Sequence, residues 1–230
     1  SLFGRESGQK AEELIERHPG NLCIGHNRYT TAGGSKEEDA QRTGEEATRH
    51  LLESERTNKA AQPHGFKHGG QSVVLASNGD IPFCLRIKKE LETTRGCRFA
   101  SNCDAEILAN LIGLQIYEEG LDEIAAFARV GESLEAAFSV VALTPSGNLV
   151  GMRDPWGIRP LFWAKNEVGA MICSESGIMD EFDKLQEVPP GHLVIISDNG
   201  TVEIREFRTE RRHFCLLEVY YFSRPDSELD

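Results

Sequence analysis

Three short segments carry side chains that could together bind a small zwitterion. Arg28 follows the apolar run 22–26, and a guanidinium can hold a carboxylate with two parallel hydrogen bonds. Asn78 and Gly79 join a side-chain amide to a glycine N–H, two donors that suit a developing oxyanion. Asp104 could be the counter-ion of an ammonium group. Such a set describes a site for a free amino acid with a scissile acyl group, although spacing alone does not prove it.

Each of these segments also has an ordinary structural interpretation. A lone arginine most often forms a structural ion pair, and Asn-Gly is a favoured dipeptide of hairpin turns. Asp104 opens an expected helix, where a first-turn carboxylate adds about 0.3–1 kcal/mol of stability. From the residues alone, both sets of interpretations stay open.

The expected secondary structure indicates an α+β fold. Helices are predicted over residues 10–18, 83–95, 104–118 and 121–137. Strands are predicted at 22–26, 72–77, 138–144, 149–153, 161–165, 170–173, 192–197 and 201–207. Helices between two groups of antiparallel strands favour a layered domain over a βαβ nucleotide fold. The sequence also contains no G-x-G-x-x-G or G-K-[ST] phosphate loop.

Composition narrows the class of protein. A chain of 230 residues suffices for one large domain or two small ones. Its net charge of −12 argues against partners such as nucleic acid or an anionic membrane surface. No apolar run approaches the ~20 residues of a spanning helix, and no targeting segment opens the chain. Six scattered cysteines are typical of reduced thiols, so we expect a cytoplasmic protein.

Several motifs resemble those of one enzyme family. The run G-H-N-R-Y-T-T-A-G at 25–33 resembles the G-H-x-R-Y-x-T-x-G segment of class II, N-terminal-nucleophile glutamine amidotransferases. Residues 61–63, 77–79 and 104–106 resemble the next three signatures in order, and 153–161, 174–176 and 187–191 resemble later ones. Residues 215–227 resemble the segment that leads into the phosphoribosyltransferase half of the amidophosphoribosyltransferases, which separates this chain from relatives that make glucosamine, asparagine or glutamate.

The resemblance implies a fold and a function. The fold would be a four-layer αββα sandwich of the N-terminal-nucleophile hydrolase type, incomplete at its N-terminus. Residues 1–214 would form the glutaminase domain, with a charged insertion at about 35–60, and 215–230 would connect it to an absent phosphoribosyltransferase domain. The activity would be hydrolysis of glutamine, supplying ammonia for phosphoribosylamine formation from phosphoribosyl pyrophosphate in de novo purine synthesis.

The resemblance also implies roles for single residues. Arg28 would hold the α-carboxylate of glutamine and Asp104 its α-ammonium group, while Asn78 and Gly79 would form the oxyanion hole. Further pocket-lining residues would be Tyr29, Thr31 and Ala32. A structural role, holding a hairpin by buried ion pairing, is expected of Arg153, Asp154 and Arg159.

The nucleophile of this family is an N-terminal cysteine, whose α-amine serves as the base. Such an amine has an ordinary pKa of roughly 7.7–8.0, which suits that task at neutral pH. This chain opens with Ser1, which lies too few residues before His26 to fill the position. Cys103 lies beside Asp104 but lacks a paired histidine and the terminal amine. We therefore expect the 230 residues to be inactive by themselves.

Cofactors and partners follow from the same resemblance. No cofactor is expected in these residues, whereas Mg²⁺ is expected in the full-length enzyme. Cys215 occupies a position that some members use as an iron–sulfur ligand and others keep without a cluster, so both alternatives stay open. The partners would be glutamine, phosphoribosyl pyrophosphate through the missing domain, and further copies in a homo-oligomer. The alternatives are another class II glutamine amidotransferase and a non-catalytic glutamine-binding module.

Overall fold

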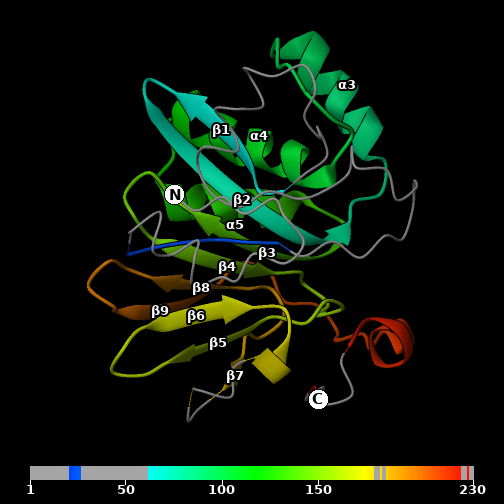
Figure 1. The fold of residues 1–230 in the computed structure, drawn as a ribbon. Coiled ribbons are helices and arrows are strands. Elements are labelled where there is room, and N and C mark those ends of the chain that lie inside the picture. The colour runs from blue at the N-terminus through cyan, green and yellow to red at the C-terminus, as the bar shows by residue number, and fades with distance from the viewer. Residues whose placement is uncertain (1–20, 27–61, 179–181, 183–184, 224–226, 228–230) are drawn as a thin grey trace, which may run out of the picture. The chain divides into compact units, whose positions relative to one another are not determined.

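The computed structural model describes residues 21–26, 62–178, 182, 185–223 and 227 (Figure 1). The expected helix at 10–18 and the charged insertion lie outside the described residues. The chain divides into two compact units, and each is described by itself. Unit 1 comprises Ser1–Ser77 and Phe83–Gly120, and unit 2 comprises Asn78–Pro82 and Leu121–Asp230.

Unit 1 is built on a β-hairpin and two helices. The strands β1 (His64–His68) and β2 (Gln71–Asp80) pair antiparallel, with Gly69 and Gly70 at positive φ between them. The helices are α3 (Cys84–Thr94) and α4 (Asp104–Tyr117). On α4, Gly113 lies so close to Phe66 of β1 that an added Cβ would sit 2.2 Å from its ring. This close approach fixes α4, and with it Asp104, against the hairpin.

Unit 2 contains two sheets that lie against each other. In the first, the end of β2 is followed by β3 (Ala137–Leu143), β4 (Leu149–Arg153), β8 (His192–Ile196) and β9 (Val202–Glu206). The second has the order β6 (Ala170–Cys173), β5 (Phe162–Lys165) and β7 (Gln186–Glu187). Gly151 of β4 faces Ile172 of β6, where an added Cβ would lie 2.9 Å from the isoleucine side chain. Only a residue without a side chain lets the sheets meet this closely.

Helical elements complete unit 2. The helix α5 (Glu123–Ser133) is capped by Asp122, and its Gly131 lies against the ring of Phe207. Two short elements follow later in the chain, the 3-10 turn η2 (Ser176–Ile178) and the π-helical turn η3 (Glu218–Phe222). Within the described part of the chain, no helix is both long enough and apolar enough to cross a membrane.

Most predicted elements are confirmed, with ends shifted by a few residues. The helix expected at 121–137 is shorter, because α5 ends at Ser133 and the chain is already extended at Leu134. The strand expected at 72–77 is longer and runs to Asp80. The sequence did not predict β1 or β7. The strand predicted at 22–26 is wrong, because the structure assigns no strand there. A central glycine in β1 and the two-residue length of β7 leave no local pattern to detect.

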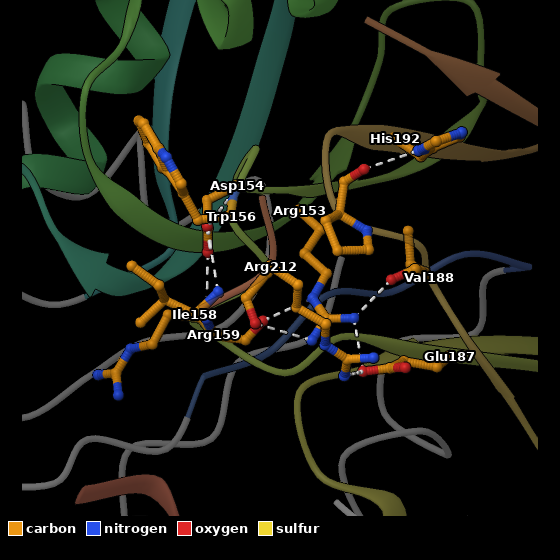
Figure 2. A network of polar contacts seen from close by, with 11 residues as sticks. Arg153, Asp154, Trp156, Ile158, Arg159, Glu187, Val188, His192 and Arg212 are labelled. Atoms are coloured by element: carbon orange, nitrogen blue, oxygen red, sulfur yellow. Dashed lines mark hydrogen bonds and ion pairs between the residues drawn. The ribbon is translucent and has the colours of Figure 1, made fainter. Parts of the chain in front are cut away.

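A buried carboxylate organises the turn that follows β4. Asp154 is 0% exposed, and its oxygens accept hydrogen bonds from the backbone N–H groups of Trp156, Ile158, Arg159 and Phe138 at 3.0–3.3 Å (Figure 2). Its own carbonyl accepts from the N–H of Gly191 at 2.9 Å. Burial raises the pKa of Asp154 above its ordinary value, while these N–H groups oppose the shift. The side chain therefore replaces water for four donors that would otherwise be buried without partners.

Arg153 holds the same turn from the other side. Its guanidinium donates to the carbonyls of Gly157, Arg159 and Val188, and it forms an ion pair with Glu187 at 2.6 Å (Figure 2). The expected structural role of Arg153 is thus confirmed. For Asp154 the expected mechanism is wrong, because its contacts are hydrogen bonds to backbone N–H groups and not an ion pair with arginine.

The Asp154 contacts generate a stability prediction. Asp154→Asn should lower the free energy of unfolding by roughly 2–4 kcal/mol, because an amide presents one acceptor oxygen and each buried donor left unpaired costs about 1–3 kcal/mol. Urea unfolding at pH 7 measures the change. Asp198→Asn, at an exposed turn position, is the matched control and should shift stability by less than about 0.5 kcal/mol. Equal effects of the two substitutions would contradict the role given to Asp154.

Candidate functional site

Asn78 and Gly79 lie within the last residues of β2, in unit 2. The alternative that they form a hairpin turn is therefore wrong. Gly79 has no positive φ, and an added Cβ would lie 2.4 Å from the carbonyl oxygen of Ala137 and 2.8 Å from the Cα of Phe138. The start of β3 occupies that space. Gly79 is needed here for the close approach of two backbones, not for a turn conformation.

The side chain of Asn78 has a defined orientation. Its Oδ1 accepts a hydrogen bond from Nη2 of Arg159 at 2.9 Å. A guanidinium has donors and no acceptor, so the atom that faces it must be the amide oxygen. The NH₂ group of Asn78 therefore points away from Arg159.

Arg159 is itself held at both ends. Its backbone N–H donates to Asp154 at 3.1 Å. Its Nη1 forms an ion pair with Glu218, whose side chain is 6% exposed, and its guanidinium carbon lies 4.8 Å from the ring centroid of Phe222. Burial raises the pKa of Glu218, and the charge of Arg159 opposes that shift. The π-helical turn η3 thus holds the guanidinium of Arg159, and Asp154 holds its backbone.

Arg159 makes a contact that the structural role predicted from the sequence did not include. The expected ion pairing is confirmed by Glu218, but the contact with Asn78 was missed. Asn78 and Arg159 are 81 residues apart in sequence, so no local spacing links them. The only sequence signal was that each lies in a family-like motif.

Asp104 is the first residue of α4, in unit 1, as expected. Its Oδ1 accepts from the N–H of Ala105 at 2.8 Å and lies 3.7 Å from the thiol of Cys103. The neighbouring Glu106 is buried and accepts from the N–H groups of Ala100 and Ser101 at 2.7 and 2.8 Å. Glu106 therefore secures the loop before α4, and the loop need not be held by Asp104.

The cysteines offer no nucleophile of the expected kind. All six are free of disulfides. Burial, and secondarily the charge of Asp104, raise the pKa of Cys103 to about 12. A thiol with that pKa is almost wholly protonated at neutral pH, and the thiolate is the reactive form. This high pKa supports the expectation that Cys103 is not the nucleophile.

The described residues do not fit a metal or cluster site. Among them, no group of three or more His, Cys, Asp or Glu side chains gathers closely enough to hold an ion. An iron–sulfur cluster is held by four thiolates, and Cys215 is a single half-buried thiol. That Cys215 is an iron–sulfur ligand in the full-length protein stays a prediction.

The predicted pocket residues fall in different parts of the chain. Asn78 and Gly79 belong to unit 2 and Asp104 to unit 1. Arg28, Tyr29, Thr31 and Ala32 lie outside the described residues. That these groups face one ligand stays a prediction.

Known proteins share both the sequence and the fold of this chain. Amidophosphoribosyltransferases from Archaeoglobus fulgidus and Escherichia coli are 32% and 30% identical over 95% and 94% of the chain. The chain spans only 43% and 41% of their lengths. The solved glutamine phosphoribosylpyrophosphate amidotransferase from Bacillus subtilis, complexed with ADP and GMP, matches 74% of this chain with a TM-score of 0.66 at 30% identity.

The fold likeness confirms the predicted α+β sandwich, here with mixed sheets and helices. The profile of the glutamine amidotransferase domain matches residues 49–181, more than half of the sequence. That match spans Asn78, Gly79, Asp104 and Arg159. The chain therefore belongs to the glutamine amidotransferase domain family.

Proposed function

We propose that this chain is the glutamine-hydrolysing part of an amidophosphoribosyltransferase. Ammonia released from glutamine would aminate phosphoribosyl pyrophosphate, in the first committed step of purine synthesis. The relatives that support this proposal carry that name, and the chain matches about two fifths of their length. The observation that carries the glutaminase role is the orientation of Asn78, whose amide oxygen is bonded to Arg159.

The proposed chemistry needs two donors at one oxygen. Attack of a thiolate on the side-chain amide carbon of glutamine would form a C–S bond and a tetrahedral intermediate, whose former carbonyl oxygen carries the negative charge. Collapse of this intermediate would break the C–N bond and leave a thioester, and the nitrogen would leave as ammonia with the proton that the α-amine took from the thiol. Water would then hydrolyse the thioester to glutamate and free the thiol. The NH₂ of Asn78 and the N–H of Gly79 would stabilise the charge, and donors fixed beforehand reorganise little during the reaction.

Recognition of glutamine would rest on its two charged main-chain groups. Arg28 would bind the α-carboxylate and Asp104 the α-ammonium group, with Tyr29, Thr31 and Ala32 lining the pocket. A forked guanidinium suits a carboxylate because it offers two parallel N–H donors. Asp104 begins α4, and the buried Glu106 in the first turn of this helix anchors the loop before it.

Other parts of the reaction would come from outside residues 1–230. We propose an N-terminal cysteine as the attacking thiol, and a phosphoribosyltransferase domain with Mg²⁺ as the place where ammonia is used. A homo-oligomer and a cytoplasmic location belong to the same proposal. The six free cysteines support the cytoplasmic location.

The oxyanion role of Asn78 gives the first functional prediction. In the protein expressed from its whole open reading frame, Asn78→Ala should lower kcat for glutamine hydrolysis by about 10²–10³-fold with little change in KM, because the donor acts on the transition state. An ammonia-release assay measures both constants. Asn148→Ala, which removes an amide bonded to Ser146 in the 145–148 turn, should leave kcat unchanged. Full activity of Asn78→Ala would contradict the proposal.

The counter-ion role of Asp104 gives a second prediction. Asp104→Asn should raise KM for glutamine by roughly 10–100-fold, because a hydrogen bond to a charged group contributes about 1.5–3 kcal/mol. The matched control is Asp122→Asn at the start of α5, whose side chain accepts from the N–H groups of Ile124 and Ala125.

If Asp104 were only a helix acid, both substitutions would change stability slightly and neither would change KM. Calorimetric titration with glutamine, beside the ammonia-release assay, separates the proposed enzyme from a non-catalytic glutamine-binding module. A non-catalytic binding module would bind glutamine through Arg28 and Asp104 and release no ammonia.

A further inference from the structure

The structure points to a positioning role for Arg159, which sets the orientation of the Asn78 amide. This inference rests on the proposed oxyanion role of Asn78 and goes beyond the structural role that the sequence indicated for Arg159. The observation is the hydrogen bond from Nη2 of Arg159 to Oδ1 of Asn78, at 2.9 Å. Both residues belong to unit 2.

The amide of an asparagine needs an external partner to choose its orientation. Rotation about the terminal torsion of Asn is broad and roughly two-fold, so both the oxygen and the NH₂ group can face a given point. If the oxygen faced the reacting centre, it would repel the developing oxyanion. A guanidinium beside the amide removes this ambiguity, because it has no acceptor for the NH₂ group. Arg159 therefore turns the donor end of Asn78 toward the side opposite itself.

Arg159 can do this because it is fixed more firmly than a surface arginine. Nη1 is paired with Glu218, which is nearly buried, and the Phe222 ring lies 4.8 Å from the guanidinium carbon. The backbone of Arg159 is held by Asp154 through its N–H and by Arg153 through its carbonyl, at 3.1 and 2.8 Å. These contacts leave Nη2 directed at Asn78.

The positive charge of Arg159 is balanced where it lies. Glu218 carries the opposite charge, so the pair as a whole is neutral. The effect assigned to Arg159 is therefore orientation of a dipole and not direct attraction of the oxyanion. A loss of Arg159 should act only while Asn78 is present, and this condition makes the inference testable.

The test compares two substitutions at residue 159 in the protein expressed from its whole open reading frame. Arg159→Lys keeps a positive charge for Glu218 but carries it on one nitrogen, which cannot span Glu218 and Asn78 as the forked guanidinium does. Arg159→Met combined with Glu218→Gln removes the ion pair as a whole, so that no buried charge is left unpaired. Glutamine hydrolysis is measured as kcat and KM, and thermal unfolding shows that each variant is folded.

We expect kcat to fall by roughly 10–100-fold in both variants, within the loss for a whole oxyanion donor, while KM for glutamine changes by less than about threefold. In the Asn78→Ala background the same substitutions should lower kcat by less than about twofold further, because residues that act as one unit are not additive. The matched control is Arg208→Lys. Arg208 also lies over an aromatic ring, that of Trp156 at 5.3 Å, and is paired with carboxylates, those of Glu135 and Glu210. This substitution should leave kcat unchanged.

Three results would overturn the inference. The first is wild-type kcat in both variants, and the second is a full 10–100-fold loss again in the Asn78→Ala background. The third is an equal loss in Arg208→Lys, which would indicate a general effect on the fold. Failure of the proposed function is distinct, because it would show as unchanged glutamine hydrolysis in Asn78→Ala by itself.

Discussion

The arrangement of unit 2 depends on one buried carboxylate and the backbone N–H groups that it accepts. Asp154 follows β4 directly, and its two oxygens bond the N–H groups of Phe138, Trp156, Ile158 and Arg159. Water cannot reach these donors, because Asp154 is fully buried. Without the carboxylate the turn would contain unpaired donors, and the backbone of Arg159 would lose one of its two anchors. The path from Asp154 to Arg159 to Asn78 therefore links the packing of a turn to the orientation of a side chain in β2.

Both arginines of this turn lie beside a carboxylate. Arg153 is paired with Glu187, which also binds Arg212 at 2.7 Å, and Arg159 is paired with Glu218. A buried guanidinium without a carboxylate would pay a large desolvation cost. The other N–H groups of Arg153 donate to backbone carbonyls, and Nη2 of Arg159 donates to Asn78. Each guanidinium therefore has both an opposite charge and hydrogen-bond acceptors. The contacts at Glu218 draw the segment after residue 215 into the same network as the end of β2.

Three glycines allow elements of the fold to pack closely against one another. Gly79 leaves space for Ala137 and Phe138 of β3, Gly113 for Phe66, and Gly151 for Ile172. At each of these positions a methyl group would meet an atom at less than 3.0 Å. Of the three, Gly79 lies beside Asn78, whose amide is oriented by Arg159.

The sequence by itself determined the α+β class and most of the helices and strands, including the helix that begins at Asp104, because periodicity is local. It did not identify β1 or β7, whose short runs carry no periodic signal. Nor could it pair Arg159 with Glu218 and Asn78, because the chain has 37 acidic residues and any of them could neutralise an arginine. That choice is made only when strands distant in sequence come together. The tertiary structure decided that Asn78 lies in a strand and which end of its amide is free to donate, since both depend on neighbours up to 81 residues away.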